Sequence, residues 1–198
     1  YGDNNHPPFL LSEYYPYTLK GIIKKLSDVE RIRIILEIIH AMISVHQFGI
    51  IHRNLKPENI MLTASKQVKI GDFGIDKLLS IKEIIQSKKS NDDSIKFLAP
   101  ELLQHQEYDN KVDIFAFGTT LFFILTRGEY PKIAGTKGSN FLDSLNTLSK
   151  QIIQSCWNES ADHRPSFKQI LEMIVQGNFM VIDGIESEIP LIRSFHLS

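Results

Sequence analysis

One short polar segment constrains this chain more than any other. Residues 51–62 read Ile-His-Arg-Asn-Leu-Lys-Pro-Glu-Asn-Ile-Met-Leu, and Asp72-Phe73-Gly74 follows shortly afterwards. Between the two motifs, residues 60–63 and 68–70 form two apolar runs separated by a short turn-like stretch, which predicts a β-hairpin. We therefore expect a polar loop that leads into a hairpin, with Asp72 placed directly after the second strand.

The composition favours one globular unit. The chain has 198 residues, 42% of them hydrophobic, which is enough for one buried core and short for two domains. The 22 basic and 23 acidic residues nearly balance, so charge gives no reason to expect nucleic acid or an anionic membrane as a partner. Cys156 is the only cysteine, which excludes an internal disulfide and favours a reducing, cytoplasmic location.

Two other segments bear on targeting. The most apolar run, Ile114–Thr126, is shorter than the roughly 20 residues needed to cross a bilayer, so we expect a core helix and no evident membrane partner. The sequence begins at Tyr1, and no charged segment precedes an apolar one near this start. We therefore expect no signal peptide, and a chain that begins inside a longer protein.

Local patterns predict a mainly helical fold. The clearest helix begins at Ser27, because Ser27-Asp28-Val29-Glu30 is a capping box. An extended strand is expected over residues 9–15, a brief helix near Leu19, and a mobile segment over 75–98. The remaining predicted helices cover residues 100–104, 112–126, 144–156 and 166–175. The apolar residues in 177–198 predict a packed tail without a readable register.

The motifs resemble the large C-terminal lobe of the protein kinase superfamily. Asn59 lies five positions after Asn54, as in the H-R-D-x-x-x-x-N loop of that family. Asp72-Phe73-Gly74 and Ala99-Pro100-Glu101 then follow in the family's order. The resemblance implies an α+β, mainly α-helical fold with a short β-hairpin. It also implies one kinase-like domain over residues 1–198, with its hinge at about 9–16, the lobe at 17–176 and the tail at 177–198.

The family's phosphate-covering parts are not visible before the hinge. We find no G-x-G-x-x-G loop and no V-A-I-K strand there. The small N-terminal lobe is therefore expected to be missing from this chain. Mg²⁺ and ATP are expected as cofactors if the parent protein carries that lobe, and weak or no nucleotide binding is expected for this chain alone.

The resemblance assigns metal and nucleotide contacts to several residues. Asp72 and Asn59 are expected to hold Mg²⁺, and Lys56 to meet the transferred phosphate. The Glu13 carbonyl and the Tyr15 N–H are expected at the adenine edge, and Met61 beneath the ring. In the alternative interpretation, Asp72 caps a turn, Asn59 bonds to loop backbone, Lys56 lies in an exposed turn, and residues 13–15 form a half-buried strand.

Sequence features also indicate a branch of the family. The run Leu55-Lys56-Pro57-Glu58-Asn59 favours serine/threonine kinases, whereas Cys156-Trp157 and residues 163–167 resemble the tyrosine-kinase-like branch. We therefore expect a tyrosine-kinase-like protein of serine/threonine character. Its partner should be a protein substrate or a signalling protein, and the sequence does not indicate an oligomeric state.

Asn54 stands where active kinases carry an aspartate base. A neutral amide is similar in shape but very weakly basic, so loss of general-base assistance should cost about 10²- to 10⁴-fold in rate. We therefore expect a pseudokinase with a signalling or scaffold role. Two alternatives stay open: the lobe of an active ATP-dependent kinase, and an interaction domain that needs no nucleotide.

Other matched residues are expected to be structural. His52 and Phe73 should stack on each other, and Asp113 should anchor the backbone of the polar loop. Glu101 and Arg164 should form a buried ion pair. Arg53 is a candidate receptor for a phosphorylated serine in 75–98. The alternative for one such residue, Ser94, is a structural hydroxyl bonded to the loop.

Overall fold

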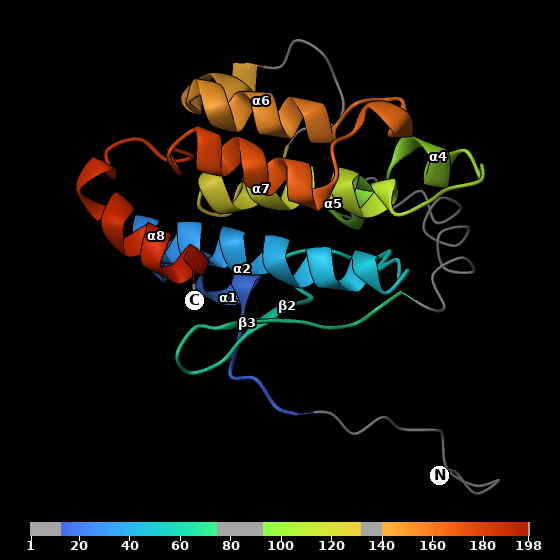
Figure 1. The fold of residues 1–198 in the computed structure, drawn as a ribbon. Coiled ribbons are helices and arrows are strands. Elements are labelled where there is room, and N and C mark those ends of the chain that lie inside the picture. The colour runs from blue at the N-terminus through green and yellow to red at the C-terminus, as the bar shows by residue number, and fades with distance from the viewer. Residues whose placement is uncertain (1–12, 75–92, 132–139, 198) are drawn as a thin grey trace, which may run out of the picture.

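The three antiparallel strands lie at one edge of a stack of helices (Figure 1). The computed structural model describes residues 13–74, 93–131 and 140–197. Strand β1 (Tyr17–Thr18) pairs with β2 (Ile60–Leu62), which pairs with β3 (Val68–Ile70). Tyr17 faces Leu62 and Ile60 faces Ile70. The predicted hairpin is thus confirmed, and the fold is mainly helical as expected.

The strand predicted over residues 9–15 is wrong where it can be checked. Residues 13–15 have no regular structure, and residues 9–12 lie outside the described part of the chain. The observed strand begins at Tyr17, directly after Pro16. Proline has no N–H to donate to a strand ladder, and cross-strand pairing with β2 then fixes where β1 lies.

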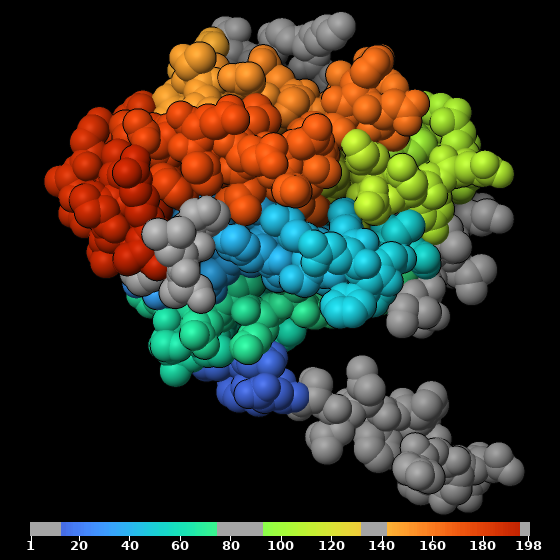
Figure 2. All heavy atoms as spheres, in the orientation of Figure 1, coloured from blue at the N-terminus to red at the C-terminus, as the bar shows by residue number. Residues whose placement is uncertain are grey.

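The longest helix, α2 (Asp28–Gln47), begins at the predicted capping box. The Ser27 hydroxyl accepts from the Glu30 N–H at 3.2 Å, and the Glu30 carboxylate accepts from the Ser27 N–H at 2.8 Å. Just before it lie the short helix α1 (Leu19–Ile22) and the 3₁₀ helix η1 (Ile23–Lys25), where a brief helix was predicted. Figure 2 shows α2 as a band between the α7 and α8 layer and the hairpin.

Helix α5 (Lys111–Leu125) forms the centre of the core. All residues from Val112 to Ile124 are buried, as expected for a core helix. Helix α6 (Thr147–Cys156) packs closely on it. A side chain at Gly118 would bring its Cβ to 2.8 Å from the Cys156 Cβ, so only glycine permits this approach. Within the described residues, no helix is both long and apolar enough to cross a membrane.

The other helices follow the predicted order. They are α4 (Pro100–Leu103), the 3₁₀ helices η3 (Asn140–Ser144) and η4 (Ala161–His163), and α7 (Phe167–Gln176). The start predicted for α6 at Ser144 is three residues early. Asn146 is the N-cap, because its side chain accepts from the Ser149 N–H at 2.9 Å.

The tail packs against the body of the lobe, as expected. It contains the 3₁₀ helix η5 (Glu186–Glu188) and helix α8 (Ile189–Leu197), which lies against α2 (Figure 1). Its buried apolar side chains are Phe179, Val181, Ile185 and Ile192. The α8 helix itself was not predicted.

Part of the segment predicted to be mobile is folded. Residues 75–92 lie outside the described part of the chain, whereas Asp93–Phe97 form the 3₁₀ helix η2. Phe97 is buried, and the Thr119 hydroxyl of α5 donates to the Lys96 carbonyl at 2.9 Å. The mobile prediction is therefore wrong for residues 93–97, because contacts with α5 supply the order that the local sequence does not indicate.

Candidate active site

The polar loop between α2 and β2 is anchored from below by Asp113. This fully buried side chain of α5 accepts from the backbone N–H groups of His52 and Arg53, both at 2.8 Å. It also accepts from His46 Nε2 at 2.9 Å. The predicted anchoring role of Asp113 is thus confirmed. The contact with His46 was not predicted from the sequence.

The Asp72 segment lies beside this loop through a stacked pair. The rings of His52 and Phe73 have centroids 4.4 Å apart and are tilted by 34°, which confirms the predicted contact. The Gly74 N–H donates to the His52 carbonyl at 2.9 Å, and the Asn54 N–H donates to His52 Nδ1 at 3.1 Å. His52 therefore joins the two motifs and has a structural role.

Asn54 and Asp72 are in direct contact. Asn54 is buried, and its Nδ2 donates to Asp72 Oδ2 at 2.6 Å and to the Asp72 carbonyl at 3.1 Å. Asp72 holds a left-handed backbone with a φ of 56°. Because both oxygens of Asp72 can only accept, the amide nitrogen must face them. The amide oxygen of Asn54 is thereby directed away from Asp72.

Asn59 joins the same hydrogen-bonded group. Its Nδ2 donates to the Asn54 carbonyl at 2.8 Å, as the alternative interpretation of Asn59 expected. This contact uses the amide nitrogen, whereas Mg²⁺ is bound by oxygen. It therefore orients the Asn59 amide without using the atom that a metal would need.

The predicted metal ligands fit a hard divalent cation. Asp72 offers carboxylate oxygens and Asn59 an amide oxygen, and both side chains bond to Asn54. Oxygen donors of these types are the ones that Mg²⁺ prefers. In the described ranges, no group of three or more His, Cys, Asp or Glu side chains could form another metal site.

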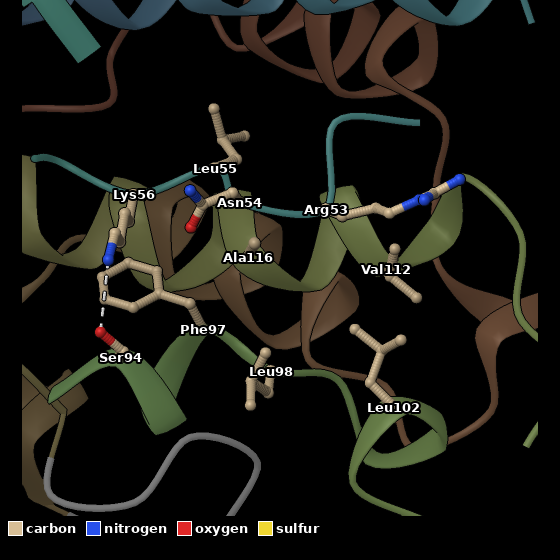
Figure 3. Close-up of a pocket in the computed structure, with 10 residues that line it drawn as sticks. All are labelled: Arg53, Asn54, Leu55, Lys56, Ser94, Phe97, Leu98, Leu102, Val112 and Ala116. Atoms are coloured by element: carbon tan, nitrogen blue, oxygen red, sulfur yellow. Dashed lines mark hydrogen bonds between the residues drawn. The ribbon is translucent and has the colours of Figure 1, made fainter. Parts of the chain in front are cut away.

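Lys56 extends from the loop toward η2. Its Nζ donates to the Ser94 hydroxyl at 3.3 Å, on one side of a small pocket formed by the loop, η2, α4 and α5 (Figure 3). Most of the other lining side chains are apolar, among them Phe97, Leu98 and Leu102. The contact supports the structural interpretation of Ser94.

Arg53 lies at the far end of the same pocket in Figure 3. Its guanidinium carbon is 5.8 Å from the centre of the Tyr108 ring, a cation–π geometry. Other candidate phosphoserines, Ser87 and Ser90, lie outside the described residues. A phosphate contact with Arg53 therefore stays a prediction.

Glu58 forms a contact that sequence analysis missed. Its Oε1 accepts from Lys20 Nζ at 2.8 Å and from the Tyr130 hydroxyl at 3.1 Å. Burial favours the neutral Glu58 carboxyl, but hydrogen bonds from Lys20, from the backbone and from Tyr130, together with the Lys20 charge, lower the pKa of Glu58. Burial and the Glu58 charge raise the pKa of Tyr130 to about 12. The loop is thereby tied to α1 and to the chain after α5.

The residues predicted to contact the nucleotide lie just before β1 and in β2. The Tyr15 hydroxyl donates to Glu13 Oε2 at 2.8 Å, and this bond raises the pKa of Tyr15. Met61 lies in β2 beside Gly71, where an added Cβ would clash with its methyl carbon. Adenine contact by Glu13, Tyr15 and Met61 stays a prediction.

The expected ion pair between Glu101 and Arg164 is present. Arg164 Nη1 and Nη2 donate to the two carboxylate oxygens of Glu101 at 2.6 and 2.9 Å, and both residues are buried. Arg164 also donates to the carbonyls of Asn158 and Lys111. A bidentate pair with these additional partners is a structural element that fixes α4 against the η4 segment.

Comparisons with known proteins agree with these motifs. The family model described as protein tyrosine and serine/threonine kinase matches residues 4–174. Serine/threonine-protein kinase 12 of Arabidopsis thaliana is 28% identical over 86% of this chain and 41% of its own length. Mitogen-activated protein kinase kinase kinase 12 of Rattus norvegicus is 38% identical over 64% of this chain and 15% of its own length.

A third relative, dual specificity protein kinase shkE of Dictyostelium discoideum, is 31% identical over 63% of this chain and 19% of its own length. The chain therefore spans less than half the length of each of these relatives. The family model, in contrast, matches most of the chain. The chain belongs to the protein tyrosine and serine/threonine kinase family.

Proposed function

We propose that this chain is part of a kinase-type signalling module that binds Mg²⁺ and ATP in its intact gene product but transfers phosphate poorly. One observation carries the proposal. The side chain at the catalytic-base position is the amide of Asn54, and its nitrogen is committed to Asp72 at 2.6 Å. A group in this state has no basic atom with which to take a proton from an attacking hydroxyl.

Asn54 retains part of the role of a base. Its amide oxygen, directed away from Asp72, can accept a hydrogen bond from a hydroxyl and orient it. It cannot carry away the proton, and general acid–base assistance is typically worth about 10²- to 10⁴-fold. Because phosphoryl transfer relies mainly on positioning and charge stabilisation, we expect a severe reduction in rate and not a complete loss.

The rest of the site supports nucleotide binding. Asp72 and Asn59 would hold Mg²⁺, which supplies neutralising charge for the phosphate oxygens when bound. Lys56 bonds to Ser94 on the same side of the loop as the pocket in Figure 3. Its ammonium group would contact the transferred phosphate by giving up the bond to Ser94. His52 and Asp113 hold the loop backbone in place through hydrogen bonds, and the backbone positions these side chains.

A second candidate function is an active serine/threonine kinase. It is favoured by the retention of Lys56 and Asn59 on a well-anchored loop, with Asp72 beside them. In that case the Asn54 oxygen would orient the hydroxyl and solvent would accept the proton. This alternative predicts ordinary turnover by the native protein.

Two measurements on the intact gene product test the proposal. Mg·ATP should raise the melting temperature, because a ligand that binds only the folded state stabilises it. Transfer of phosphate to a mixed serine/threonine peptide pool should be weak in the same preparation. The matched control is Asp72→Asn, which removes the charged metal ligand and should reduce the thermal shift.

Each other outcome favours a different function. A thermal shift together with brisk transfer would support the active kinase. No shift at millimolar Mg·ATP, with native and Asp72→Asn proteins behaving alike, would support a nucleotide-independent interaction domain.

A further inference from the structure

We infer that the Asn54 amide is a built-in substitute for a cation at Asp72, so that the site is stable without a divalent metal and binds one weakly. This inference rests on the proposed function, because it concerns the same candidate Mg²⁺ site. It goes beyond reduced catalysis, since it predicts how the protein behaves when neither nucleotide nor metal is present.

The contact between the two side chains carries the inference. The single nitrogen Asn54 Nδ2 donates to both Asp72 Oδ2, at 2.6 Å, and the Asp72 carbonyl, at 3.1 Å. The two bonds hold the Asp72 carboxylate and its left-handed backbone at once. Asn54 is only 7% exposed whereas Asp72 is exposed, so the amide meets the carboxylate at the protein surface. A hydrogen bond to a charged group is stronger than one between neutral groups.

No charged side chain in the described part of the chain takes the place of the Asn54 amide. Among the residues that the structure describes, no Lys, Arg or His side chain forms an ion pair with Asp72, and Lys56 bonds to Ser94 instead. The amide of Asn54 is therefore the described side chain that donates to the Asp72 carboxylate, which is itself exposed. Its two donor hydrogens make it suitable, since each can point at one acceptor.

An aspartate at position 54 would reverse this interaction. It has the same shape as asparagine but would place a carboxylate oxygen where Nδ2 now lies, 2.6 Å from Asp72 Oδ2. Two carboxylates at that distance repel each other unless a cation or a proton lies between them. An aspartate at position 54 would thus gain more from a bound cation than Asn54 does.

Asn54 also touches the second candidate ligand. Asn59 donates to the Asn54 carbonyl at 2.8 Å, so Asn54 bonds to both Asp72 and Asn59. A divalent cation that used Asp72 Oδ2 would have to compete with the amide for that oxygen. Asp72 Oδ1 and Asn59 Oδ1 would still be able to bind it, so we expect weakened and not abolished metal affinity.

The experiment compares four forms of the intact gene product without nucleotide: native, Asn54→Asp, Asp72→Asn, and the exchange variant Asn54→Asp/Asp72→Asn. Melting temperatures are measured in EDTA and in millimolar Mg²⁺, and Mg²⁺ binding is measured by calorimetry. Native protein should melt at nearly the same temperature in both buffers. Asn54→Asp should melt several degrees lower in EDTA, recover in Mg²⁺, and bind Mg²⁺ roughly tenfold more tightly.

The exchange variant is the matched control. It again pairs one amide with one carboxylate, so its melting temperature in EDTA should return toward the native value. If Asn54→Asp does not fold in either buffer, a folded exchange variant still supports the inference, and an unfolded one overturns it. Equal melting temperatures in EDTA and equal Mg²⁺ affinities for native and Asn54→Asp proteins also overturn it.

These readouts do not depend on phosphotransfer. A native protein that transfers phosphate briskly, yet is insensitive to EDTA, would contradict the proposed function and leave this inference supported. A poorly active native protein that needs Mg²⁺ to fold would do the reverse.

Discussion

Single buried polar side chains anchor the polar loop between α2 and β2, and Asp113 is the clearest of them. Its carboxylate accepts three hydrogen bonds, two from loop backbone and one from His46. Without Asp113 the N–H groups of His52 and Arg53 would be left unpaired near the core. Unpaired buried donors cost about 1–3 kcal/mol each.

Asp113→Ala should therefore lower the free energy of unfolding by about 3–5 kcal/mol. Asp113→Asn should cost clearly less, because its amide oxygen can still accept one of the backbone N–H groups. Urea titration of both variants in the intact gene product measures the difference. A cost below about 1 kcal/mol for Asp113→Ala would show that the loop does not depend on this anchor.

The sequence indicated some of these residues and not others. Asn54, Asn59 and Asp72 were expected at one site because their motifs resemble those of the kinase family, and the structure brings them together. The partners Lys20 and Tyr130 of Glu58 were missed, since they lie 38 and 72 positions from it. A local sequence pattern cannot identify a hydrogen-bond partner that lies far away in the sequence and is brought close only by the tertiary fold.

Helix starts were predictable where one side chain caps the helix. Ser27 and Ser166 each form a complete capping box, and α2 and α7 begin there. The start of α6 was misplaced because Ser144 and Asn146 are both plausible caps, and only the observed bond to the Ser149 N–H distinguishes them. Strand β1 was misplaced because its two residues are exposed and held by pairing alone.

Helix α8 shows the limit of periodicity. Its residues gave no readable register, and the helix is held by packing of the tail on α2. Of two neighbours on α8, Ile192 is fully buried whereas Leu191 is 47% exposed. This difference gives a matched pair for testing whether the tail belongs to the folded lobe.

Ile192→Ala should destabilise the intact gene product by about 2–5 kcal/mol, the usual cost of truncating a buried isoleucine. Leu191→Ala should change the free energy of unfolding by about 0.5 kcal/mol or less, because its side chain is largely in water. Denaturant titration of the two variants gives the comparison. Equal effects would mean that α8 does not pack as described.

The hydrophobic core contains one thiol, that of Cys156, whose pKa is raised by burial. Cys156 of α6 is fully buried beside Gly118, and burial raises the pKa of its thiol to about 12. A raised pKa means that the folded state holds the proton more tightly than the unfolded state does. The resulting stability is complete below the unfolded pKa, near 9, and is lost as the pH rises toward 12.

We therefore expect the free energy of unfolding to fall between pH 9 and pH 12. Cys156→Ala should start from a lower stability, because it leaves a small cavity, but its stability should fall less steeply across this range. Chemical denaturation at several pH values measures both slopes. Parallel slopes for native and Cys156→Ala proteins would show that the thiol does not contribute.

We propose that the amide at position 54 limits phosphate transfer by this protein. The most direct test is the rate of phosphate transfer by the intact gene product at saturating Mg·ATP, compared between native protein and Asn54→Asp. We expect a gain of about 10²- to 10⁴-fold for Asn54→Asp, with no gain for the control Asn54→Ala. Equal rates for native and Asn54→Asp proteins, both at the level of ordinary kinases, would contradict it.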